Sequence, residues 1–165
     1  MGSEMCIRDS IVRNLSDDQA VIVMVDSNLQ REEILPSEKA FAYKMKLDAM
    51  KRQGQRRDLT SVPLAQKFKG KTSREILGEQ VGESQDQIRR YIRLTELIPE
   101  ILEMVDDKKI SMRPAVELSY LSKEEQEVLY DTMESEACTP SHAQAIKIRK
   151  FSAEGRSVSY THLRA

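Results

Sequence analysis

The interior of the chain alternates polar start signals with apolar residues at helical spacing. The first run opens at Ser16 with "SDDQ", where a Ser and the Gln three residues later can satisfy each other's free backbone N–H groups. The stretch that follows, "AVIVMVDSNLQRE", carries β-branched residues at 21–25, which also suit a buried strand. We favour a helix, because the capping pattern precedes the run and no turn signal interrupts it before Asp26.

The second run, "LPSEKAFAYKMKLDAMKRQG", predicts a long helix. Pro36 suits the first helical position, and Gly54 suits the position just past the end. The apolar stripe of this helix consists of Ala40, Phe41, Met45 and residues 47–50. Residues 55–71 then break the periodicity with a Pro and a Gly, and we interpret them as a basic connector.

A denser series of helix starts occupies the rest of the interior. Capping boxes are predicted at Thr72 with Glu75, at Ser84 with Gln87 and at Ser122 with Glu125. Further starts are predicted at Pro99, at Ser111, and at Thr139 followed by Pro140. The pattern therefore predicts an all-α fold of about eight short helices with a central helix-turn-helix.

The central pair of helices has the outline of a helix-turn-helix. Residues 73–80 and the helix that follows Ser84 are both capped, and only a short turn separates them. Gly82 lies where the turn requires a positive φ, which glycine adopts without steric cost. Gly78 lies where the two helices are expected to cross closely, so that a side chain would separate them.

The second of these helices presents arginine on the face opposite its apolar face. Tyr91 and Ile92 fall within about 60° of Ile88 on a helical wheel, whereas Arg90 and Arg93 fall on the other side. Arginine pairs with guanine, glutamine pairs with adenine, and a helix start can hold a phosphate. The predicted DNA contacts are Thr72, Ser73, Arg74, Ser84, Gln85, Asp86, Arg89, Arg90 and Arg93. The alternative is a helical hairpin with a solvated charged face.

The charge distribution supports the first interpretation. The net charge is −1, but residues 44–93 hold 13 Lys and Arg against 6 Asp and Glu. The rest of the chain holds 13 against 21, so a basic middle indicates a local anion-binding surface, unless the clustering is accidental.

We expect a cytosolic protein, since no apolar run approaches the roughly 20 residues of a membrane span. The isolated Cys6, Cys138, His142 and His162 do not predict a metal site.

Both ends of the chain lack the periodicity of its interior. We expect residues 1–10, with "GSEMCIRDS", and residues 157–165, "SVSYTHLRA", to be artefactual tails that resemble translated sequencing adapters. On that interpretation the natural part is a fragment of a longer protein.

Three stretches resemble the ParB/RepB family of partition proteins, which includes the nucleoid-occlusion factors. They are "SNLQREEILPSEKAFAY" at 27–43, "REILGEQVGESQDQIRRYIRLTELIPEI" at 74–101 and "KKISMRPAVELSYL" at 108–121. The resemblance implies that residues 11–54 end a nucleotide-binding domain and that residues 72–156 form the helix-turn-helix domain. It also implies dimers that bind a centromere-like DNA palindrome at the nucleoid, with a ParA-like ATPase as partner.

The resemblance further implies CTP and Mg²⁺ as cofactors of the intact protein, in a clamp that CTP closes and hydrolysis reopens. By position, Asn28, Gln30 and Arg31 would bind the nucleotide, Asn28 would also lie at the metal, and Arg113 would support DNA binding. Arginine forks match phosphate oxygens, and Mg²⁺ prefers oxygen ligands.

The sequence departs from the family pattern at several positions. Ser27 stands in place of Glu, which bears on metal coordination, Arg90 in place of Asn, and Pro114 in place of His. The Gly-x-Arg-Arg motif expected before residue 11 and the C-terminal dimerisation domain are not in the sequence, so we expect no CTP hydrolysis by this fragment. The alternatives to a partition protein are a transcriptional regulator of a mobile element, a CTP-dependent switch, and a helical protein-interaction module.

Overall fold

The computed structural model describes residues 14–31, 33–55 and 72–154, and the side chains of residues 53–55 are not part of that description. Within these ranges the chain forms eight helices and no strand, so the all-α prediction is confirmed. The helices are α1 (Asp17–Leu29), α2 (Pro36–Gln55), α3 (Ser73–Val81), α4 (Gln85–Leu94), α5 (Pro99–Asp106), α6 (Met112–Leu118), α7 (Lys123–Ser135) and α8 (His142–Ala153). The predicted tails, and the predicted connector beyond Gln55, lie outside the described residues.

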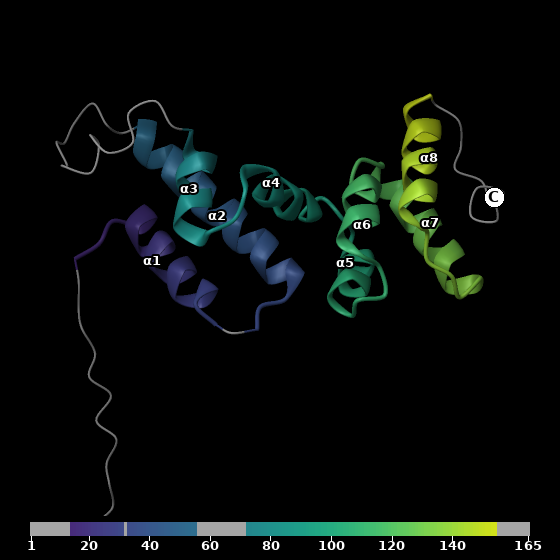
Figure 1. The fold of residues 1–165 in the computed structure, drawn as a ribbon, viewed down its shortest axis with the longest axis horizontal. Helices are drawn as coiled ribbons and strands as arrows, with labels where there is room; N and C mark the ends of the chain where they lie inside the picture. The colour runs from purple at the N-terminus through teal and green to yellow at the C-terminus, as the bar shows by residue number, and fades with distance from the viewer. Residues whose placement is uncertain (1–13, 32, 56–71, 155–165) are drawn as a thin grey trace, which may run out of the picture.

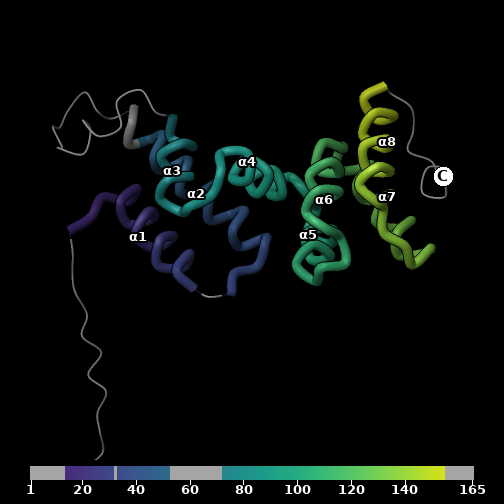
Figure 2. Tube along the Cα trace, viewed as in Figure 1, coloured from purple at the N-terminus to yellow at the C-terminus, as the bar shows by residue number. Residues whose placement is uncertain are grey.

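Helix α4 lies between two groups of helices (Figure 1). Helices α1, α2 and α3 lie on one side of it and α5 to α8 on the other, as the tube in Figure 2 also shows. A small core of Tyr43, Leu47, Leu77 and Ile88 joins α2, α3 and α4. A larger core runs through α5 to α8 and takes Leu94 from the end of α4 and Ala40 from α2. The two ends of α4 are therefore buried in different cores.

The ambiguous run at residues 21–25 is helical, as predicted, and belongs to α1. Val25 is buried, whereas Val23 and Met24 are exposed, so only one side of the helix packs on α2. Two ion pairs join the helices: Arg52 Nε lies 2.8 Å from Asp18 Oδ1, and Lys46 Nζ lies 2.5 Å from Asp26 Oδ1. Lys46 is buried, so its charge depends on Asp26 for compensation.

Most predicted helix starts are confirmed. Reciprocal capping boxes form at Ser16, Thr72 and Ser122, and Pro99 opens α5. Ser111 is the N-cap of α6, although its side chain makes no capping hydrogen bond. Pro36 opens α2, as predicted. Gly54 was predicted to lie just past the end of this helix, but the helix continues through Gly54 to Gln55, so that prediction is wrong.

The last helix begins later than predicted, and Thr139 is not its N-cap. Ser141 takes that place: its Oγ accepts from the Gln144 N–H, and Gln144 Oε1 accepts from the Ser141 N–H at 2.8 Å. The residue three positions after Thr139 is His142, which offers no carboxylate or amide oxygen for the reciprocal bond. The box at Ser141 satisfies two backbone donors, and Pro140 is buried before the helix.

In the turn after α5, Lys108 adopts the left-handed backbone conformation, which is unfavourable for residues other than glycine. Lys108 has φ 60°, and the N–H groups of the next two residues both donate to the Met104 carbonyl, at 2.9 and 3.0 Å. We expect Lys108→Gly to stabilise the protein by about 0.5–1 kcal/mol, because glycine adopts this conformation without strain. Thermal unfolding measures the effect. Lys108→Ala is the matched control, since it removes the side chain but keeps the strain; equal melting temperatures for the two variants would contradict the prediction.

No helix in the described ranges is both long enough and apolar enough to cross a membrane.

Candidate nucleic-acid interface

The turn between α3 and α4 depends on two glycines. Gly82 ends α3 with φ 71° and ψ 21°, and the Gly78 carbonyl accepts from the N–H groups of both Gly82 and Glu83. A Cβ on Gly78 would lie 2.6 Å from the Glu83 carbonyl oxygen, a distance that side chains do not tolerate. The Gly82 prediction is confirmed. Gly78 is also at a close approach, but the part of the chain that passes close to it is the backbone of the turn at Glu83 rather than helix α4, which the sequence had led us to expect.

Helix α4 is anchored by its apolar face. Ile88 is fully buried beside Leu77, and Tyr91 packs edge-on against Tyr43 of α2 with ring centroids 5.6 Å apart. Leu94 reaches the larger core at the other end of the helix. These contacts fix which side of α4 faces outward.

The outward side carries most of the predicted DNA contacts. Ser84, Gln85, Asp86, Arg89 and Arg90 are exposed on or before α4, Thr72 and Arg74 are exposed at the start of α3, and Ser73 is half-buried there. In the described part of the chain, neither Arg89 nor Arg90 makes an ion pair or a side-chain hydrogen bond. Two guanidinium groups are thus presented to solvent with no internal partner among these residues.

The predicted capping box at Ser84 is only half formed. Ser84 Oγ accepts from the Gln87 N–H at 3.2 Å, but the Gln87 side chain turns away and donates to Met112 Sδ at 3.4 Å. This contact brings the start of α6 beside the first turn of α4. Arg113, the next residue, is exposed, and its support of DNA binding stays a prediction.

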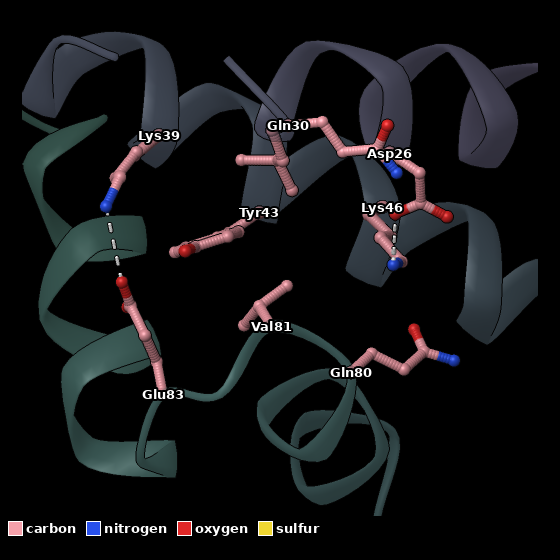
Figure 3. A pocket seen from close by; sticks show the side chains of 9 residues that line it. Asp26, Gln30, Lys39, Tyr43, Lys46, Gln80, Val81 and Glu83 are labelled. Atoms are coloured by element: carbon pink, nitrogen blue, oxygen red, sulfur yellow. Dashed lines mark hydrogen bonds and ion pairs between the residues drawn. The ribbon is translucent and has the colours of Figure 1, made fainter. Parts of the chain in front are cut away.

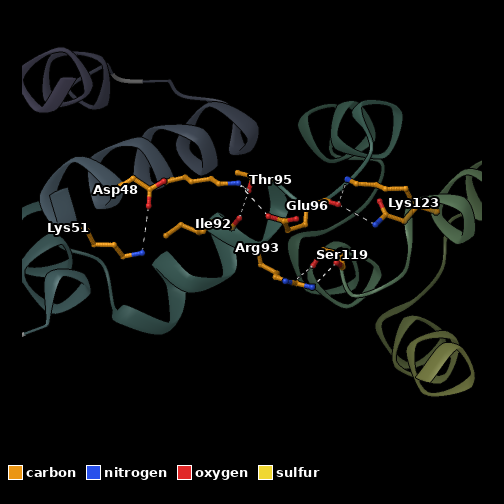
Figure 4. A network of polar contacts seen from close by, with 10 residues as sticks. Asp48, Lys51, Ile92, Arg93, Thr95, Glu96, Ser119 and Lys123 are labelled. Carbon is orange, nitrogen blue, oxygen red and sulfur yellow. Dashed lines mark hydrogen bonds and ion pairs between the residues drawn. The ribbon is translucent and has the colours of Figure 1, made fainter. Parts of the chain in front are cut away.

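Arg93 differs from Arg89 and Arg90 because it is held by the protein itself. Its Nε donates to Ser119 Oγ at 3.1 Å and its Nη2 donates to the Ser119 carbonyl at 2.9 Å (Figure 4). The guanidinium also lies 4.0 Å from the centroid of the Tyr120 ring, and that of Arg149 lies 3.9 Å from the same ring. The helical wheel placed Arg93 with Arg90, but a wheel does not show that α6 packs there.

The segment between α4 and α5 is held by polar contacts that the sequence pattern did not indicate. Lys44 Nζ donates to Thr95 Oγ1 at 3.1 Å, and Lys123 Nζ donates to the Glu96 carbonyl at 2.6 Å (Figure 4). Gln126 is completely buried; its Oε1 accepts from the Ile98 N–H at 2.9 Å, and its Nε2 donates to the Leu121 carbonyl at 3.0 Å. The sequence gives no sign of this role, because a glutamine in a helix is usually exposed and only the packing shows that Gln126 is buried.

A cavity of about 420 Å³ lies between α1, α2 and the glycine turn. Figure 3 shows Lys39 and Glu83 meeting at one end of it, with Nζ and Oε1 3.4 Å apart, and Tyr43 pointing toward this pair from the side. Burial raises the pKa of the Tyr43 phenol, and the neighbouring Glu83 carboxylate raises this pKa further. The phenol therefore stays protonated at neutral pH. Each lysine of the cavity, Lys39 and Lys46, is already paired with a carboxylate.

The residues assigned to the nucleotide do not form an enclosed site. Asn28, Gln30 and Arg31 are all exposed at the end of α1, and of the three only Gln30 borders the cavity. No group of three or more His, Cys, Asp or Glu in the described ranges is arranged to hold a metal ion. Binding of CTP and Mg²⁺, with Asn28 at the metal, stays a prediction about a longer protein.

Two capped helices joined by a glycine turn, the second with one buried face and one arginine-bearing face, define a helix-turn-helix DNA-binding domain. The family model described as the ParB HTH domain matches residues 57–149. The chain therefore belongs to the ParB family, and the resemblance noted in the sequence is confirmed.

Known relatives agree with this assignment. A nucleoid occlusion protein of Listeria monocytogenes is 36% identical over 119 residues, which cover 72% of this chain and 35% of the relative. A nucleoid occlusion protein of Oceanobacillus iheyensis is 31% identical over 127 residues, which cover 76% of this chain and 37% of the relative. The chain thus spans little more than a third of the length of these relatives.

Proposed function

We propose that this chain reads double-stranded DNA with the exposed face of α4, as the DNA-recognition part of a ParB-family protein that acts in partition or nucleoid occlusion. The observation that carries the proposal is the orientation of α4: Ile88 is buried, while Gln85, Arg89 and Arg90 face solvent. Such a helix fits the major groove, and its first turns reach the base edges.

The neighbouring residues support a division of labour. The Thr72 N–H is taken by the Glu75 carboxylate in the capping box, but the backbone N–H groups of Ser73 and Arg74 and the positive charge of Arg74 suit a phosphate at the start of α3. Arg89 and Arg90 present forks that suit guanine. Asp86 repels phosphate but is able to accept a hydrogen bond from the amino group of cytosine, so we assign it to base recognition.

The wider role is proposed from the family. In the longer protein, two copies of this domain bind a palindromic site at the nucleoid, and a ParA-like ATPase is the partner for partition. Selection from a random duplex pool tests this arrangement. The longer protein should enrich an inverted repeat, whereas this chain alone should enrich a single half-site.

DNA recognition itself is tested with Arg90→Ala and Arg74→Ala on the selected duplex and on a shuffled duplex of equal length. We expect Arg90→Ala to cost about 1–3 kcal/mol on the selected duplex and to change which bases are enriched. Arg74→Ala should weaken binding to both duplexes equally and lower the salt dependence by about one phosphate contact. Gel shifts across a salt series supply both measurements.

Lys147→Ala is the matched control, because it removes one exposed positive charge from α8 rather than from α3 or α4. Lys147 lies about 200° around α8 from Arg149, the arginine of α8 that contacts Tyr120. The Lys147→Ala variant should leave both affinities unchanged. If the wild-type chain binds neither duplex even at low salt, the proposed function is wrong.

A further inference from the structure

We propose that Arg93 is a positioning residue, which sets the orientation of α4 by stacking on Tyr120, and that Tyr120 thereby contributes to sequence discrimination. The proposal rests on the function proposed above, but it assigns Arg93 a task other than the DNA contact predicted from the helical wheel. It also gives a role to Tyr120, which lies in the third family-like stretch but had no role assigned there, and to Arg149, which lies outside the three stretches.

The first argument is that the guanidinium of Arg93 is fully engaged on one side. Nε and Nη2 donate to the hydroxyl and the carbonyl of the same residue, Ser119, at 3.1 and 2.9 Å. Ser119 is buried at the end of α6, and its own hydroxyl hydrogen goes to the Val116 carbonyl at 2.7 Å. Toward Arg93, Ser119 Oγ therefore acts as an acceptor. The two Ser119 oxygens, Oγ and the carbonyl oxygen, are reached together by the two N–H donors of one planar guanidinium, which a lysine ammonium does not offer.

The second argument is the stack itself. The Tyr120 ring has the guanidinium of Arg93 at 4.0 Å and that of Arg149 at 3.9 Å, distances at which a cation is attracted to an aromatic face. Arg149 is held in turn by Glu117 Oε2 at 2.8 Å. One aromatic ring thus links α4, α6 and α8, although it is itself partly exposed.

The third argument is that α4 is tied to α6 at two places. Gln87 contacts Met112 near the start of α4, and Arg93 contacts Ser119 near its end. Gln87 and Arg93 are six positions apart, which is about 9 Å along a helix. The apolar contacts of Ile88, Tyr91 and Leu94 set which side of α4 faces outward, and the second tie limits the small rotations about the helix axis that these contacts still allow. A rotation of about 10° moves the tip of Arg90 by roughly 1–2 Å. A shift of that size is enough to spoil a bidentate contact with a base.

A conservative substitution distinguishes positioning from DNA contact. Arg93→Lys keeps the charge but loses the fork and the planar stack, so we expect about tenfold weaker binding to the selected duplex and little change on the shuffled duplex. The salt dependence should stay as in the wild type. Tyr120→Leu should reproduce this loss, whereas Tyr120→Phe, which keeps the ring, should bind like the wild type.

Thermal unfolding without DNA completes the test. Arg93→Lys and Tyr120→Leu should each lower the melting temperature by roughly 2–4 °C. The double variant should lower it by less than the sum of the two single effects, because both substitutions remove the same contact. Arg90→Lys should leave the melting temperature unchanged. If Arg93→Lys melts and binds like the wild type while Arg93→Gln lowers the salt dependence by about one phosphate, Arg93 is a DNA contact and the inference is overturned. If the wild-type chain binds no duplex, the proposed function and the contribution of Tyr120 to sequence discrimination both fail, while non-additive melting still shows whether Arg93 and Tyr120 act together in the fold.

Discussion

Gly78→Ala is expected to destabilise the protein by about 1–3 kcal/mol, although alanine is the better helix former. The new Cβ would lie 2.6 Å from the Glu83 carbonyl oxygen, and that oxygen belongs to the backbone of the turn rather than to a flexible side chain. The turn must therefore move, and α4 starts directly after it at Gln85. We expect the variant to lose sequence-specific DNA binding as well as stability.

The measurement is thermal unfolding together with gel shifts on the selected duplex. Gln80→Ala is the matched control, because it also places alanine in α3 but on the exposed side, and it should change the free energy of unfolding by less than about 0.5 kcal/mol. A Gly78→Ala protein that melts at or above the wild-type temperature would show that the turn does not need this close approach to α3.

Gln126→Leu is expected to destabilise the protein by about 2–4 kcal/mol, even though leucine has a similar volume and suits a buried position. The Ile98 N–H loses its acceptor at 2.9 Å, and the Leu121 carbonyl loses a donor at 3.0 Å. Both groups belong to segments packed in the larger core, so water replaces the amide poorly. The third partner, the Glu96 carbonyl, still accepts from Lys123.

Chemical denaturation gives the free energy of unfolding of this variant. Glu127→Leu serves as the matched control, since it introduces the same residue on the exposed side of α7 and should stay within about 0.5 kcal/mol of the wild type. Equal stability of Gln126→Leu and the control would mean that the segment between α4 and α5 is not held by this amide.

Several features followed from the sequence because their physical causes are local. The capping boxes at Ser16, Thr72 and Ser122 join residues three positions apart, so the residues alone specify them. Gly82 was predicted from the geometry that a short turn requires, and it has the expected positive φ. The apolar face of α4, centred on Ile88, followed from helical periodicity in the same way. The order of the three family-like stretches led to the ParB family, which the family match confirms.

The features that only the tertiary structure decided all involve partners distant in sequence. Gln87 has the local option of a capping box, yet its side chain contacts Met112, because the packing of α6 brings a sulfur within reach. The helical wheel places Arg93 and Arg90 on the same side of α4, opposite Ile88. Arg93 nevertheless contacts Ser119 and Tyr120 at the end of α6, whereas no such partner reaches Arg90 among the described residues. The sequence by itself determined most of the helix starts and the outward face of α4, since short-range contacts set them. Which of these arginines has partners inside the protein was decided by how α6 packs, because packing sets the distances that periodicity leaves open.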